Sequence, residues 1–135
     1  MQVQSLEIRN PEDIDPAFES AIRSKTGAIL ITQSPPITTY PKRIVDVAAK
    51  HRLPVMYPQG QWPDMGGLMS YGANVDDSYR YLASYVDKIL KGSKPAELPV
   101  ERSKKLELVI NLKAAKQIGV TIPPNVLARA DKVIR

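Results

Sequence analysis

Short apolar runs, each followed by an amphipathic stretch with helix-start signals, most constrain the fold of this 135-residue chain. Ala28–Ile31, Val55–Tyr57 and Leu68–Tyr71 are such runs. A short continuous apolar run is typical of a strand that is buried on both faces, because helices cover both sides of a parallel sheet. The repeated order of strand and helix therefore predicts an α/β fold with a mostly parallel sheet and helices on both faces.

Further elements complete the predicted layout. The alternation of Val3–Ile8 predicts an additional strand, and Leu106–Leu112 predicts a last one. Residues that favour helix starts precede the amphipathic stretches. Helices are expected from Asn10, Pro41 and Asn74, and shorter ones over Ala114–Ile118 and Pro124–Ile134.

The length suits a single domain. A linker at Lys94–Pro99 divides it into an α/β lobe over residues 1–99 and a strand–helix extension over residues 100–135 that packs on the same domain. No apolar run reaches the roughly 18 residues that a membrane-spanning helix needs. The chain has no Cys, so disulfide and thiolate chemistry are excluded.

The net charge of +5 is unevenly placed. Residues 1–99 carry 11 basic and 11 acidic side chains, whereas residues 100–135 carry 8 basic and 3 acidic ones. A basic tail can bind nucleic acid. These charges alternate with Leu, Val and Ile and lack aromatic residues for base stacking, so a solvated helix surface is the better interpretation and no nucleic-acid partner is expected.

Several motifs together resemble one known family. They are Gly66–Leu68 with Tyr71–Gly72, Tyr85–Gly92, Val109–Lys113, Thr121–Pro124 and Arg129–Asp131. In these motifs the chain is similar to the carboxy-terminal part of the ABC transporter substrate-binding proteins that include binders of tryptophan and other aromatic amino acids. The resemblance implies a three-layer, Rossmann-like lobe of a type I periplasmic binding protein, with residues 1–99 as its ligand-binding lobe.

Family members have two lobes and an export signal, whereas this chain has room for about one lobe. The resemblance implies a location in the periplasm or at the cell surface. The amino terminus lacks a basic segment followed by an apolar one, so the location is expected to be cytoplasmic if Met1 is the natural start.

In an open parallel sheet, ligands bind beyond the carboxyl ends of the strands. Three predicted loops leave those ends: Thr32–Pro36, Pro58–Trp62 and Tyr71–Asp77. We expect them to form the rim of a cleft, with the second lobe of the family as its other jaw.

The loop from Tyr71 to Asp77 is the richest in candidate ligand contacts. Tyr71 offers an aromatic wall, Gly72 allows close backbone approach, and the helix start after Asn74 suits a carboxylate. Asp76 or Asp77 could take a ligand ammonium group. The alternative is that these polar residues only cap the helix.

The other two loops allow similar pairs of interpretations. Gln33 and Ser34 could hydrogen-bond the backbone of an amino acid, or they could satisfy a polar turn before two prolines. A stacking platform could be supplied by Tyr57, Gln59, Gln61 and Trp62, or Trp62 could be a partly buried anchor.

Catalytic and cofactor chemistry have little support. The only His, His51, lies between Lys50 and Arg52 at a predicted helix end, where the helix dipole explains it. No Cys or second His is present for a transition-metal site, and no GxGxxG, P-loop or GxSxG motif occurs. We expect no cofactor, no metal and no enzyme activity.

The predicted function is that of a solute-binding component of an ABC transporter, or one lobe of it, with a small amino-acid-like ligand and, as the family implies, a membrane permease as partner. The alternative is a stand-alone lobe that acts as a homodimeric assembly module. An apolar rim would favour such a dimer; it comprises Tyr57, Trp62, Met65, Met69 and Tyr71.

Overall fold

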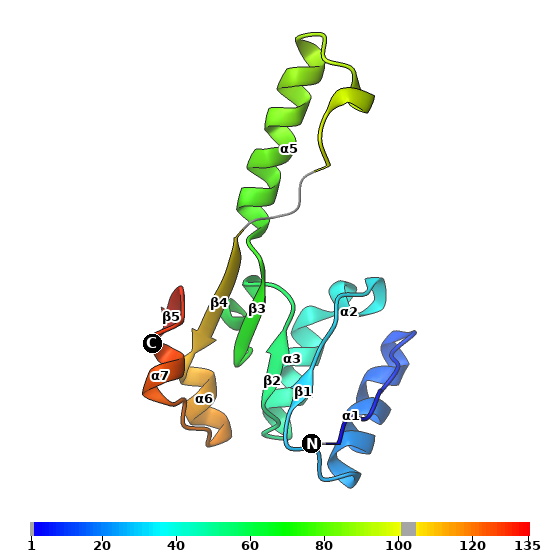
Figure 1. The fold of residues 1–135 in the computed structure, drawn as a ribbon. Coiled ribbons are helices and arrows are strands. Elements are labelled where there is room, and N and C mark those ends of the chain that lie inside the picture. Colours follow the sequence, from blue (N-terminus) through cyan, green and yellow to red (C-terminus); the bar gives the residue numbers. More distant parts are fainter. Residues whose placement is uncertain (1, 101–104) are drawn as a thin grey trace.

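The computed structural model describes residues 2–100 and 105–135 of the chain. Their five strands form one sheet in the order β1-β2-β3-β4-β5, in which only β3 and β4 pair antiparallel (Figure 1). This confirms the predicted α/β fold with a mostly parallel sheet. The strands are β1 (Ile29–Leu30), β2 (Val55–Tyr57), β3 (Met69–Ala73), β4 (Leu106–Asn111) and β5 (Lys132–Ile134).

Helices follow most of the strands, as predicted. The first begins irregularly with a 3-10 turn, in which the Asp13 carboxylate accepts hydrogen bonds from the backbone N–H groups of Arg9 and Asn10. These bonds hold the pKa of Asp13 below its usual value. The elements are η1 (Pro11–Asp13), α1 (Ile14–Arg23), α2 (Pro35–Thr39), α3 (Pro41–Lys50), α4 (Gln61–Asp64), α5 (Val75–Leu90), η2 (Pro95–Glu97), α6 (Leu112–Ile118) and α7 (Pro124–Leu127).

The main core lies on one face of the sheet. Val55 and Tyr57 of β2 point to this face and pack with apolar residues of α1, α3 and α4. A small hollow on the same face is lined by Leu68 and by residues of both α3 and α6. These helices therefore bury one face of the sheet.

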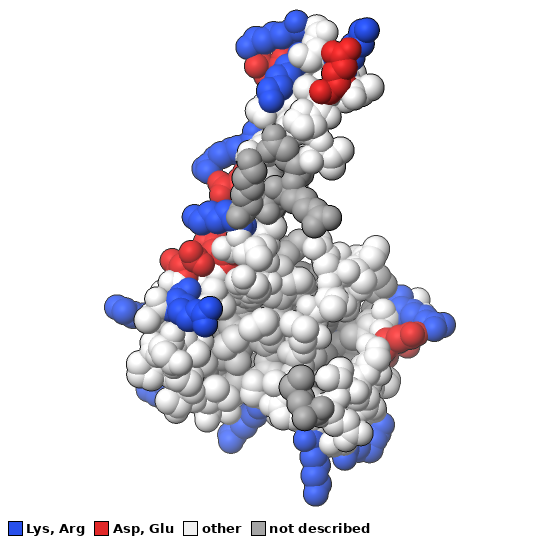
Figure 2. Space-filling model, viewed as in Figure 1, with Lys and Arg blue, Asp and Glu red and all other residues white. Residues whose placement is uncertain are grey.

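The opposite face is covered unevenly. Tyr71, directly opposite Leu108 in the ladder, points to this face and shares a groove with Val126 of α7. At the other end of the sheet Leu30 of β1 is 70% exposed. The prediction that Ala28–Ile31 is buried on both faces is therefore wrong for Ala28 and Leu30, which are both exposed. Figure 2 shows mainly uncharged residues across the middle of the lobe, with charged side chains at its margins.

Helix α5 stands off the lobe as an arm (Figure 1). The chain leaves the sheet through β3, runs outward along α5, turns at η2 and returns to enter β4. No residue of α5 is fully buried. The arm therefore contributes little to the core of the lobe.

Two predicted elements differ in the structure. Residues 2–9 form no strand: Val3 is exposed, Ile8 packs on the core, and β1 pairs only with β2 among the described strands. The alternation of Val3–Ile8 was typical of a strand, but a strand also needs a neighbour that completes its backbone hydrogen bonds.

The predicted terminal helix Pro124–Ile134 is wrong beyond Leu127. The N–H of Asp131 donates to the carbonyl of Leu108, and the N–H of Leu108 donates to the Asp131 carboxylate. These two bonds seat the chain beside β4, where Lys132–Ile134 continues as the parallel strand β5. Pairing with the sheet thus outweighs the local helix preference.

Gly72 allows β3 to pass the end of β2 closely. A Cβ atom at this position would lie 2.0 Å from the carbonyl oxygen of Pro58, which is the residue that follows β2. No side chain fits at that distance. The close backbone approach predicted for Gly72 therefore involves the protein's own chain.

We expect Gly72→Ala to destabilise the lobe by about 1–3 kcal/mol or more, because the new methyl group forces β3 away from Pro58. Gly27→Ala is the matched control, since a Cβ there meets no atom within 4 Å. It should leave stability unchanged or raise it by up to about 1 kcal/mol. Urea unfolding followed by circular dichroism measures both, and equal midpoints for the two variants would contradict the role given to Gly72.

Candidate functional site

The carboxyl ends of β1, β2 and β3 lie at one edge of the sheet because these three strands are parallel neighbours. The segment that leads from β1 into α2 and the segment that leads from β3 into α5 both leave from this edge (Figure 1). The structure thus brings Gln33, Ser34, Gly72, Asn74 and Asp76 to a common edge, as the parallel sheet predicts.

Ser34 and Gln33 follow β1. Gln33 is exposed and Ser34 is half-buried. Ser34 occupies the N-cap position of the short helix α2 with an extended backbone, but its side chain makes no capping bond. Its carbonyl oxygen accepts from the N–H and the hydroxyl of Thr38. The Ser34 hydroxyl is therefore not used for the cap.

Tyr57 is 1% exposed and Trp62 is fully buried. Their rings stack with centroids 4.9 Å apart and an interplanar angle of 20°. Burial, with a smaller contribution from the carboxylate of Asp46, raises the pKa of the Tyr57 hydroxyl well above its usual value. The prediction that these two rings form an exposed rim is wrong, because both are buried and close the core between β2 and α4.

Tyr71 is 52% exposed and points to the face opposite Tyr57. It lines an open groove of about 330 Å³. The other lining residues are Leu106, Leu108, Val126, Arg129 and Asp131. Tyr71 thus offers an accessible aromatic surface beside the edge, in a groove that Arg129 and Asp131 also line.

Asn74 joins the start of α5 to β4. Its Oδ1 atom accepts the N–H of Asp77 at 3.0 Å, which is the predicted cap. Its Nδ2 group donates to Glu107 at 2.9 Å. Both the oxygen and the nitrogen of the Asn74 side-chain amide are thus hydrogen-bonded.

Glu107 was not predicted as a site residue, because nothing in the sequence indicated that β4 pairs antiparallel with β3 and brings this carboxylate to Asn74.

The two carboxylates in the first turn of α5 have different surroundings. Asp77 pairs with Arg80 at 3.0 Å and is half-buried. Asp76 is exposed and forms no ion pair with the residues that the structure describes. Because both acids lie in the first turn, their negative charges disfavour the binding of a ligand carboxylate at this helix start. Asp76 is therefore the better placed of the two to meet a cation.

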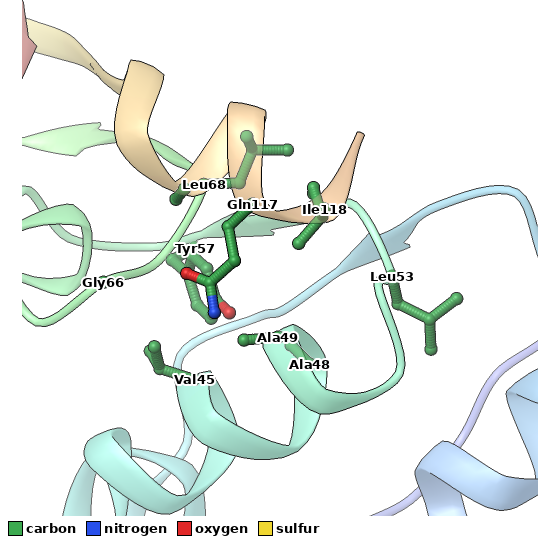
Figure 3. A pocket seen from close by; sticks show the side chains of 10 residues that line it. Val45, Ala48, Ala49, Leu53, Tyr57, Gly66, Leu68, Gln117 and Ile118 are labelled. Carbon is green, nitrogen blue, oxygen red and sulfur yellow. The ribbon is translucent and has the colours of Figure 1, made fainter. Parts of the chain in front are cut away.

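The small hollow between α3 and α6 lies away from this edge (Figure 3). Gln117 reaches into it from α6, toward Val45 and Tyr57 (Figure 3). The volume of this hollow, about 10 Å³, suits at most one water molecule. Among the described residues there is no group of three or more His, Cys, Asp or Glu side chains that could hold a metal.

Comparison with known proteins adds independent findings. The family model "ABC transporter substrate binding protein" matches residues 1–134. No curated protein matches the chain. Among solved structures, the chain is similar to a conserved domain protein of Vibrio cholerae, with 28% identity over 93% of this chain and 42% of the other, and a TM-score of 0.83.

It is also similar to an ABC domain of Streptococcus pneumoniae that was solved in complex with L-Trp. The identity is 27%, the TM-score is 0.86, and the match covers 99% of this chain and 46% of the other. A ligand-free, open substrate binding protein with adhesive properties from Clostridium difficile shares the fold, with 18% identity and a TM-score of 0.63 over 94% of this chain and 42% of the other. The chain spans less than half the length of these structures.

The hydrogen bond between Asn74 and Glu107 predicts how the stability of the lobe changes when Asn74 is replaced by a charged residue. Asn74→Asp keeps the capping oxygen but places two carboxylates side by side, so we expect a loss of about 1–2 kcal/mol at neutral pH. The loss should shrink as the pH falls and one carboxyl binds a proton. Adding Glu107→Gln should restore the bond and most of the stability. Thermal unfolding across pH checks this, and a loss that the second change leaves in place would contradict it.

Proposed function

Because the chain belongs to the ABC transporter substrate-binding protein family, we propose that it serves as one ligand-binding lobe of a solute-binding component. In this role it takes up a small polar molecule such as an amino acid and hands it to a membrane permease. The observation that carries the proposal is the match of 99% of this chain to a domain that was solved with L-Trp, at 27% identity.

The geometry of the edge supports a ligand with an ammonium group and a flat apolar part. Asp76 provides an exposed carboxylate for the ammonium group, and Tyr71 provides an aromatic surface for the apolar part. Gln33 and Ser34, which lie in the segment between β1 and α2 at the same edge, add hydrogen-bonding groups. This combination of an apolar wall and a few polar groups is typical of small-molecule sites.

Asn74 and Gly72, which the sequence also predicted as ligand contacts, have structural roles beside the proposed site. The Asn74 amide is occupied by Asp77 and Glu107, and Gly72 packs against Pro58. In the proposed site these two residues hold Tyr71 and Asp76 in place and do not touch the ligand.

The lobe is one jaw of the proposed site. The matched structures are more than twice as long as the part that this chain covers, and the second jaw would come from a second lobe. A good pocket buries roughly 70–90% of its ligand, which one jaw cannot do. We therefore expect the isolated chain to bind amino acids with dissociation constants of about millimolar or weaker.

The permease supplies the membrane part of the proposed system. Among the described residues, no helix is long and apolar enough to cross a bilayer. The proposed role places the lobe on the outer side of the membrane, where members of the family meet their permeases. We propose binding and lobe closure as its activity, without a catalytic step.

The role of Asp76 predicts a selective loss of affinity. Asp76→Asn should weaken L-tryptophan binding by about 10-fold or more, because it removes a charge-assisted hydrogen bond. Asp77→Asn is the matched control, since Asp77 is the neighbouring carboxylate and pairs with Arg80. It should change the affinity less than about twofold, a change worth under 0.5 kcal/mol. Titrations followed by NMR can measure such weak constants.

A ligand without the ammonium group separates charge recognition from general damage. 3-Methylindole, which keeps the ring and carries no charge, should bind the native chain and Asp76→Asn with equal affinity. If Asp77→Asn weakens L-tryptophan binding as much as Asp76→Asn does, the assignment of Asp76 is wrong. If L-tryptophan, other amino acids and small polar solutes all fail to bind at tens of millimolar, the proposed binding role is contradicted.

A further inference from the structure

The groove beside Tyr71 has the size of a small-molecule site. Its volume of about 330 Å³ lies within the range of roughly 300–1,000 Å³ that such sites have. Tyr71 is 52% exposed and lines this groove. In the proposed function the flat part of the ligand lies on the ring of Tyr71, so the ligand lies in this groove.

Much of the lining is apolar. Leu108 is directly opposite Tyr71 in the ladder between β3 and β4, and Leu106 lies two residues earlier in β4. Side chains at alternate positions of a strand share a face, so both leucines lie on the face of the sheet that carries Tyr71. Leu106 is 50% exposed, and Val126 of α7 adds a further apolar side chain. This lining fits an aromatic or aliphatic side chain of a ligand.

Arg129 brings a positive charge to the apolar groove. It lies in the turn between α7 and β5, and its backbone N–H donates to the carbonyl of Val126 at 3.1 Å. Two residues further on, Asp131 forms two hydrogen bonds with the backbone of Leu108, which is the ladder partner of Tyr71. The turn that carries Arg129 is therefore tied to the strand beside Tyr71.

The fold uses the carboxylate of Asp131 but not the charge of Arg129. One oxygen of Asp131 accepts the N–H of Leu108 at 2.9 Å. The guanidinium of Arg129 forms no ion pair or hydrogen bond with any residue that the structure describes. By contrast, Arg80 and Lys132 each pair with a carboxylate. The donors of Arg129 are thus available to a molecule in the groove.

The carboxylate of the proposed ligand still lacks a partner. Asp76 takes the ammonium group, and the two acids in the first turn of α5 disfavour a carboxylate at that helix start. A guanidinium presents a planar fork of N–H donors that matches a carboxylate. Of the described residues that line the groove, Arg129 alone carries a positive charge.

We propose that Arg129 binds the carboxylate of the amino-acid ligand, with the side chain of the ligand against Tyr71 and the two leucines of β4. The inference rests on the proposed function and extends the site from the carboxyl edge along the face of the sheet. The carboxylates of Asp76 and Asp131 add negative charge to this site. They disfavour a ligand with a second carboxylate, so the site selects monocarboxylic amino acids with an apolar side chain.

The first test removes the two partners one at a time. Arg129→Gln should weaken L-tryptophan binding by about 10-fold or more, because a charge-assisted hydrogen bond is lost. Tryptamine, which has the ring and the ammonium group but no carboxylate, should bind the native chain and Arg129→Gln with equal affinity. Arg135→Gln is the matched control, since it removes the same charge from the same end of the chain without touching the groove lining. It should change L-tryptophan affinity, measured by NMR titration, less than about twofold.

The second test uses only the native chain. The side-chain Nε–H signal of Arg129 should shift on addition of L-tryptophan and stay in place on addition of tryptamine. L-Glutamate should bind at least about 10-fold more weakly than L-methionine, an amino acid of similar length without the second carboxylate. Equal binding of these two amino acids would overturn the selectivity, and an Nε–H signal that ignores L-tryptophan would overturn the contact.

The outcomes separate this inference from the proposed function. If Asp76→Asn weakens L-tryptophan binding and Arg129→Gln changes it less than about twofold, the role of Arg129 is wrong while the proposed function stands. If Arg129→Gln weakens the binding of tryptamine and L-tryptophan equally, the substitution damages the groove and the assignment is also wrong. If the native chain binds no amino acid at tens of millimolar, the proposed function fails and the inference fails with it.

Discussion

The antiparallel pairing of β3 with β4 is the interaction on which the rest of this structure depends. It runs over five residue pairs, from Met69 opposite Ile110 to Ala73 opposite Leu106. The chain leaves the lobe at the end of β3 and re-enters it at the start of β4, so this ladder closes the base of the arm. It also places β4 where β5 can add to the sheet. This ladder is the strand pairing that joins residues 105–135 to the three parallel strands.

The same ladder sets the geometry of the candidate site. Tyr71 and Gly72 are consecutive in β3 and therefore point to opposite faces. Tyr71 becomes accessible on one face, and Gly72 admits the carbonyl of Pro58 on the other. Asn74 then fixes the start of α5 through its bond to Glu107 of β4. The exposed carboxylate of Asp76 thus stands on a helix whose first turn is tied to the sheet.

The sequence predicted the class of fold and the edge of the sheet that carries the site. Apolar runs and helix-start residues are local signals, and they located β2, β3, α3 and the cap at Asn74 well. The proposed roles of Gln33, Ser34, Tyr71 and Asp76 stay predictions. The same local reasoning could not find Glu107, since its contact with Asn74 joins residues 33 positions apart.

The errors have a common physical origin in contacts distant along the chain. Val3–Ile8 alternates as a strand does, but no described strand runs beside it. Lys132–Ile134 forms a strand because Asp131 binds Leu108. Tyr57 ends a predicted strand and Trp62 lies in the loop predicted after it, which suggested a place on the rim, yet their stacking closes the core. The exposed apolar surface lies instead along α5, where the sequence predicted an ordinary amphipathic helix.

The central claim is that a small amino-acid-like ligand binds at the carboxyl ends of β1, β2 and β3. A map of backbone amide shifts on addition of L-tryptophan tests it most directly. The account predicts that the shifts gather in residues 32–34 and 71–77, with α1, α6 and the far end of the sheet unchanged. Shifts confined to the opposite edge of the sheet, or to the hollow between α3 and α6, would contradict it.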